Sequence, residues 1–178
     1  VKKGRDLAEK DNLIEEVTIP EVYNGRKVTE INALAFEGCS ILKTINIPES
    51  IEYLSISNIE NASSGTGSAF QKDTLLEAVN VYGDGTHKTK YFSEDGVVYV
   101  NEDDGGVSLL LVPAAKKGSF RISDKADYIP SRVMQSSLVT ELIIPASVKE
   151  IGGNAFDSAK FTRVEFESGT GSDLSLTI

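Results

Sequence analysis

A short apolar motif, φxxφxφ, in which φ is an apolar residue, recurs from one end of the chain to the other. Its last three positions alternate, so each copy predicts a short strand with one buried face. One such strand cannot bury that face alone, and the recurrence therefore predicts stacked repeat units. The copies are Ile14/Val17/Ile19-Pro20, Leu42/Ile45/Ile47-Pro48, Leu76/Val79/Val81, Val139/Leu142/Ile144-Pro145 and Phe161/Val164/Phe166.

A second motif alternates with the first and sets the repeat length. An isoleucine stands five positions before the phenylalanine of an Ala-Phe pair in Ile31–Phe36 and in Ile151–Phe156, and Ile129–Met134 fits the same frame with Val-Met. Ile129 and Ile151 are 22 positions apart. This length lies within the span of about 20 to 29 residues that is typical of one class of solenoid repeat. The sequence therefore predicts an array of repeat units in constant register.

The segments that join the two motifs predict a corner in each unit. Pro48 and Pro145 each end an apolar strand motif, and each is followed by apolar residues three positions apart, as in Val148 and Ile151. Proline lacks the ladder donor that a central strand needs, so the chain is expected to turn there. We expect a second short extended segment near Val148 to Ile151, followed by the Ala-Phe pair closing over the core.

One stretch interrupts the array. Two apolar runs, Gly96–Val100 and Val107–Val112, flank the polar tip Asn101–Gly106, which predicts a β-hairpin. The repeat resumes in register afterwards, because Ile122 precedes Ile144 by 22 positions. We therefore predict one domain, residues 1–178, with a hairpin insertion at about 82–120.

Three segments resemble the BspA-type leucine-rich repeats of bacterial and some protist surface proteins. They are Ile31–Pro48, Ile144–Phe156 and the excursion Asp95–Ile122 with the strand that follows it. The resemblance covers most of the chain. It implies an α/β fold, a leucine-rich-repeat solenoid or horseshoe of mostly short strands joined by short turns or helical turns. It also implies a secreted or cell-surface location.

Charge and hydropathy exclude some partners. The net charge is −9 with a pI near 4.7, which argues against nucleic acid and anionic membranes, since both are bound chiefly through Lys and Arg. No run approaches the roughly 20 apolar residues that span a bilayer. The chain starts at Val1 and ends on the strand-like run Leu174–Ile178. We therefore expect a fragment of a longer protein.

Catalysis, cofactors and metals find little support in the sequence. His87 is the single histidine and lies in a turn-rich stretch, and the single cysteine, Cys39, occupies a repeat position where a small side chain packs in the core. The tip Asn101–Gly106 resembles the start of a calcium loop but has Val112 where the final acidic ligand would stand, which favours a hairpin turn. We therefore predict no catalytic residues, no cofactor and no metal.

The outward positions of the repeated strands are the candidate binding residues. Stacked strands present an extended face of the kind that repeat proteins use for binding. A merely solvated face is the alternative for any one residue, and Ile143 and Arg163 are our first choices for contacts. The candidates are Thr44, Asn46, Asn80, Glu141, Ile143, Arg163 and Glu165.

Taken with the resemblance, these residues suggest a function. The hypothesis is a non-enzymatic, adhesin-like binding module that contacts a protein or glycan ligand on host matrix or neighbouring cells. A structural spacer in a surface protein and an accessory region of a secreted polysaccharide hydrolase are the alternatives.

Overall fold

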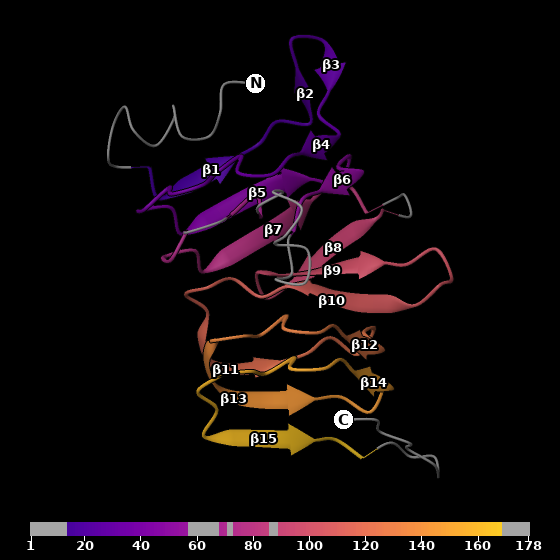
Figure 1. Cartoon of the computed structure of the whole chain (residues 1–178). Helices are drawn as coiled ribbons and strands as arrows, with labels where there is room; N and C mark the ends of the chain where they lie inside the picture. The colour runs from indigo at the N-terminus through magenta and orange to yellow at the C-terminus, as the bar shows by residue number, and fades with distance from the viewer. Residues whose placement is uncertain (1–13, 57–67, 71–72, 86–88, 169–178) are drawn as a thin grey trace.

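The computed structural model describes residues 14–56, 68–70, 73–85 and 89–168. In this part of the chain the strands stack one above another along a single axis, from the N-terminal strands at the top of Figure 1 to the C-terminal strands at the bottom. Each repeat contributes one strand to one side of the stack. A shorter strand then lies on a second side.

The first side consists of two parallel three-stranded sheets, here called the front sheets. Both follow the predicted apolar motif: in the first, Val17 pairs with Ile45 and Ile45 with Val79, and in the second Leu142 pairs with Val164. The strands predicted from the motif are thereby confirmed. The N-terminal front sheet contains β1 (Glu16–Thr18), β5 (Thr44–Pro48) and β7 (Ala78–Tyr82), and the C-terminal front sheet contains β11 (Lys117–Arg121), β13 (Leu138–Ile144) and β15 (Arg163–Phe166).

The second side carries the short strands that follow each corner. β14 is the extended segment predicted near Val148 to Ile151, and it pairs in parallel with β12 one repeat earlier. A separate small hairpin, β2 with β3, projects beyond the first repeat (Figure 1). The elements here are β2 (Val22–Tyr23), β3 (Arg26–Lys27), β4 (Glu30–Ile31) paired with β6 (Tyr53–Leu54), and β12 (Tyr128–Ile129) paired with β14 (Glu150–Ile151).

An antiparallel meander separates the two front sheets. It consists of β8 (Tyr91–Glu94), β9 (Val97–Asn101) and β10 (Val107–Leu111), and β10 continues into the second side by pairing in parallel with β12. The β9–β10 hairpin is the one predicted from the sequence. The turn between β8 and β9 packs on β7: a Cβ at Gly96 would lie 2.7 Å from Cβ of Ala78. β11, which follows, pairs with β13 as an ordinary front strand.

The predicted α/β class and its helical turns are not confirmed. The described residues are rich in strand and contain no helix. Hydrogen-bonded turns close the repeats, as in Cys39 N–H to the Phe36 carbonyl at 3.1 Å. Leu34 and Gly38 have φ of 60° and 73°, which places them in the left-handed region and prevents the turn from continuing as an α-helix.

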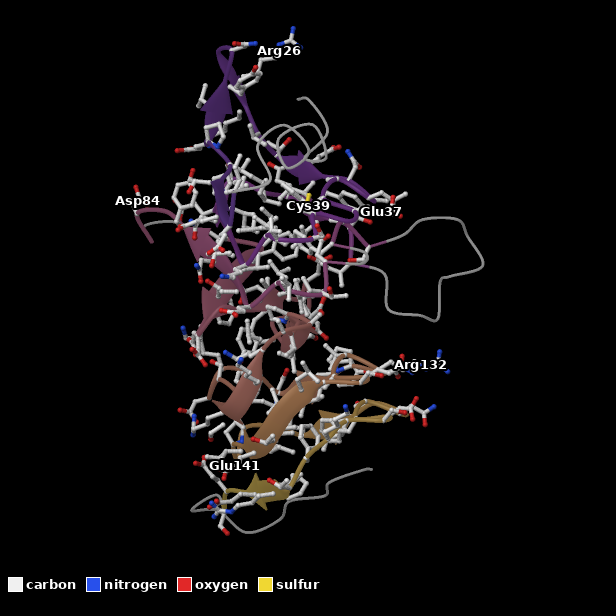
Figure 2. The ribbon with its side chains drawn as sticks, turned by 90° about the vertical axis from the view of Figure 1, so that its left-hand side faces the viewer. Arg26, Glu37, Cys39, Asp84, Arg132 and Glu141 are labelled. Carbon is white, nitrogen blue, oxygen red and sulfur yellow. The ribbon has the colours of Figure 1, made fainter. Side chains whose placement is uncertain are left out.

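Two apolar clusters fill the interior, one on each side of the meander. The first includes Ile45 and Ile47, both 0% exposed, and the second includes Leu142 and Ile129, also 0% exposed. Burying one such side chain stabilises the fold by about 1.5 to 3 kcal/mol. Cys39 belongs to the first cluster and is 2% exposed, which confirms the predicted packed cysteine; Figure 2 shows it in the interior.

Candidate binding face

All seven predicted binding residues lie on front strands, on the side opposite the core. Along β5 the core residues Ile45 and Ile47 are fully buried, whereas Thr44 and Asn46, which alternate with them, are half-buried. Asn80 is half-buried on β7. The remaining four residues are on β13 and β15. Strand alternation therefore places the candidates on the outer face, as the motif indicated.

The structure does not bring the seven residues into one continuous row. Between β7 and β11 the β8–β9 turn intervenes, because Val79 N–H donates to the Gly96 carbonyl at 2.9 Å and Val81 N–H donates to Ser93 Oγ at 2.8 Å. The candidates therefore form two patches. The N-terminal patch holds Thr44, Asn46 and Asn80, and the C-terminal patch holds Glu141, Ile143, Arg163 and Glu165.

The N-terminal patch is a ladder of amides and oxygens that crosses three strands. Asn46 and Asn80 are directly opposite in the register, and Asn80 Nδ2 donates to Asn46 Oδ1 at 2.9 Å. Asn46 Nδ2 donates in turn to Glu16 Oε1 at 2.7 Å and to Thr18 Oγ1 at 3.1 Å. These bonds fix the rotamers of the amides. The patch therefore offers a ligand preorganised polar groups of defined position.

The C-terminal patch is charged. Glu141 lies opposite Arg163 and Ile143 opposite Glu165, while Arg163 Nη2 donates to Glu165 Oε2 at 2.6 Å. Arg163 and Glu141 are exposed, and Ile143, two residues along β13 from Glu141, is half-buried. An exposed ion pair of this kind adds little stability, about 0 to 1 kcal/mol, so its charges are available to a ligand.

Arg121 extends this patch and was missed by the sequence reasoning. It stands opposite Ile143 in the β11–β13 register, and Arg121 Nη2 donates to Glu167 Oε2 and to Asp124 Oδ1, both at 2.6 Å. Its hydrogen bonds to Glu167, and then those to Asp124, raise its pKa further above the usual arginine value. β11 lacks the first apolar position of the motif, so no strand was predicted there.

The perturbed carboxyl of Asp73 lies in the interior and not on this face. Asp73 is 2% exposed, and Cys39 N–H donates to Asp73 Oδ1 at 2.9 Å. Burial raises the pKa of Asp73 to about 6, against opposing hydrogen bonds from the Cys39 and Gly38 amides. Oδ2 is buried without a hydrogen-bond partner. The arrangement fits a carboxyl that joins two repeats.

The other sites weighed from the sequence gain nothing from the structure. The tip of the β9–β10 hairpin closes as a turn, with Gly106 N–H donating to Asp104 Oδ1 at 2.9 Å. Within the described ranges no three Asp, Glu, His or Cys side chains are placed to hold a metal ion. His87 lies outside the described residues. In the part of the chain that the structure covers, no helix is long and apolar enough to cross a membrane.

Parallel strands stacked at a constant repeat, with apolar residues inside and polar rows outside, define a leucine-rich repeat protein. The comparison with family models gives the same result: six copies of the BspA-type leucine-rich repeat region match residues 9–83 and 116–172. The chain belongs to this family. The stretch between the two matches contains the meander β8 to β10. A search among curated proteins found no match.

Solved structures share the fold. A leucine-rich cell surface protein from Faecalibacterium prausnitzii is 24% identical, with a TM-score of 0.52 over 86% of this chain and 41% of that chain. The pneumococcal vaccine antigen PcpA is 23% identical, with a TM-score of 0.55 over 80% of this chain and 32% of that chain. The chain thus spans less than half of either protein.

Proposed function

We propose that this chain is a non-enzymatic binding module of a secreted or surface-displayed bacterial protein, and that its repeats form one solenoid domain within a longer polypeptide. Its ligand is a protein of the host matrix or of a neighbouring cell, contacted through the front sheets. The observation that carries this proposal is the register of polar side chains across successive repeats. The surface location of the Faecalibacterium protein supports it.

The C-terminal patch is the stronger contact region. Arginine is enriched where interfaces carry their energy, and Arg163 is exposed beside the partly buried Ile143. In the N-terminal patch the amides of Asn46 and Asn80 already bond to one another, so a ligand there would gain less free energy from hydrogen bonds. A spacer is the second candidate function, and the mutual satisfaction of the Asn46 and Asn80 amides favours it.

Binding of the 178-residue chain to immobilised matrix proteins, such as fibronectin, laminin, collagen and fibrinogen, tests the proposal. Arg163→Glu is the test variant, because it sets a third carboxylate beside Glu141 and Glu165. Arg132→Glu is the matched control, since Arg132 and Glu141 point to opposite sides of the molecule in Figure 2. Thermal unfolding of both variants checks the fold.

Saturable binding that Arg163→Glu weakens at least tenfold, and that Arg132→Glu leaves unchanged, would support the front-face module. Absence of binding to every matrix protein, or equal binding by both variants, would contradict it. The first of these contradicting results would favour the spacer.

A further inference from the structure

Two adjoining cavities form a groove where the strands of the N-terminal front sheet end. Their volumes are about 470 and 410 Å³, and both are lined by Glu49, Tyr82, Gly83 and Thr89. Each is within the range of about 300 to 1,000 Å³ that holds small ligands. Because they share these four lining residues, the groove offers two neighbouring subsites.

Tyr82 is held rigidly in this wall. It is the last residue of β7, lies opposite Pro48 in the register, and donates from its hydroxyl to the Ile19 carbonyl at 2.6 Å, across 63 residues of sequence. Its carbonyl accepts from Glu49 N–H at 2.8 Å. The side chain nevertheless remains 37% exposed. A fixed, exposed aromatic ring costs a ligand little ordering entropy when it stacks there.

Gly83 explains how a carboxylate reaches the same place. A Cβ at this position would clash with the carboxyl group of Glu49, so any other residue would require the Glu49 side chain to move. Glu49 Oε2 also accepts from Gly85 N–H at 3.4 Å. The Glu49 carboxylate and the Tyr82 ring therefore line the same two cavities.

The charges that line the groove nearly cancel. Across both cavities the lining contains the carboxylates of Glu21, Glu49, Glu52 and Asp84 and the ammonium groups of Lys27, Lys90 and Lys125. Some already pair: Lys27 lies 3.5 Å from Glu21, and Lys125 lies 2.8 Å from Glu94 outside the lining. A strongly anionic or cationic chain would meet like charges in this groove.

We propose that the groove binds a short neutral oligosaccharide, with one sugar ring stacked on Tyr82 and its hydroxyls donating to Glu49. Sugars combine an apolar ring face with many hydroxyls, and this wall combines an aromatic face with carboxylate, hydroxyl and amide groups. Two subsites suit a ligand of at least two sugar units. Tyr82 is on β7 two residues beyond Asn80, but the groove lining includes no residue of the front patches, and the site goes beyond the protein-binding function proposed above.

The test uses the 178-residue chain with cellohexaose, chitohexaose and mannohexaose as probes in titration calorimetry. Hexalysine and a sulfated oligosaccharide of equal length are the charged comparators. Tyr82→Ala should weaken oligosaccharide binding by up to about tenfold, since an aromatic contact contributes up to about that factor. Tyr82→Phe loses the bond to Ile19 but keeps the ring, so it should retain binding and controls for any loss of stability.

Tyr53→Ala is a second control, because Tyr53 is exposed but does not line the groove. Saturable binding of a neutral hexasaccharide that only Tyr82→Ala weakens, in a folded protein, supports the proposal. Absence of binding to all three hexasaccharides, equal binding by the Tyr82→Ala and Tyr53→Ala variants, or tighter binding of a charged comparator would overturn it. None of these results depends on whether a matrix protein binds the front patches.

Discussion

Replacing Asp73 by asparagine should make the stability of this protein less dependent on pH. The carboxyl is buried, and its pKa is raised from 3.8 to about 6. In the folded state the proton is therefore bound more tightly than in the unfolded chain. Between these two values the folded state holds more protons, so stability falls as the pH rises. Asparagine keeps the acceptor for Cys39 N–H and removes the titration.

The magnitude follows from the size of the shift. About two pKa units correspond to about 3 kcal/mol between full protonation and full ionisation, of which about 2 kcal/mol falls between pH 4.5 and 7.5. The advantage of Asp73→Asn over the natural chain should therefore grow by about 2 kcal/mol across that interval. The amide NH₂ of asparagine would occupy the place of Oδ2, which has no hydrogen-bond partner, and this costs stability. Because that cost is the same at every pH, it does not affect the change in stability difference between pH 4.5 and 7.5.

Urea unfolding at several pH values, followed by circular dichroism, measures the effect. Asp124→Asn is the matched control: the Arg121 hydrogen bond lowers the pKa of Asp124, so this exposed group contributes stability that is lost as the pH falls. Its variant should approach the natural chain at low pH. Parallel stability curves for the natural chain and Asp73→Asn, or a gap that widens toward acid, would refute the reasoning about Asp73.

Two further substitutions test the backbone. Ser136 has φ of 58° where the equivalent residue of the Ile31–Phe36 unit is Gly38 at 73°, so Ser136→Gly should stabilise by up to about 1 kcal/mol, measured as a rise in Tm. An unchanged or lower Tm would contradict this. Gly96→Ala should destabilise by about 1 to 3 kcal/mol, because its Cβ would meet that of Ala78 at 2.7 Å and its φ is 71°. Adding Ala78→Gly to the Gly96→Ala variant should restore part of the lost free energy of unfolding, measured in urea. If it restores none, the destabilisation comes from the backbone conformation of residue 96 alone and not from the clash with Ala78.

The front strands were predictable because their signal is local. In β5 and β13 the apolar residues that alternate on the core side are within one short segment, and a proline marks the corner, Pro48 as the last residue of β5 and Pro145 directly after β13. The conformation of the connections, by contrast, depends on contacts between repeats and not only on the local sequence. Leu34 has a left-handed backbone conformation, which leucine rarely adopts. The stacking of its turn on the next repeat imposes this conformation, and the leucine side chain does not favour it.

Two hairpins show that a dipeptide alone can predict a turn between strands. Asn24-Gly25 and Asp95-Gly96 each have positive φ at both positions, as two-residue hairpins require. The first lengthens the connection after β1, and the second joins β8 to β9. We used Gly96 only as the start of a strand and so missed β8. The Asp-Gly pair between two apolar or aromatic runs was the signal available.

The candidate sites were less accessible than the fold, because they depend on contacts between distant residues. Tyr82 and Ile19 are 63 positions apart, and Arg121 and Glu167 are 46 apart. Sequence spacing identifies which residues point outward. It does not identify which outward residues bond to one another and which face a groove.

The meander β8 to β10 divides the stack of strands into two parts. Where it enters the stack, the apolar interior separates into two clusters and the family match is interrupted. The Asn46–Asn80 ladder ends at the same place, since the next residue along the stack is the turn at Gly96 and not another front strand. Tyr82 lines the groove at this end, and β8 contributes Tyr91, Phe92 and Ser93 to the lining of the second cavity. An insertion that breaks the regular array would thus create both the boundary between the front patches and the groove, which makes the irregular repeat a better place to look for recognition than the regular ones.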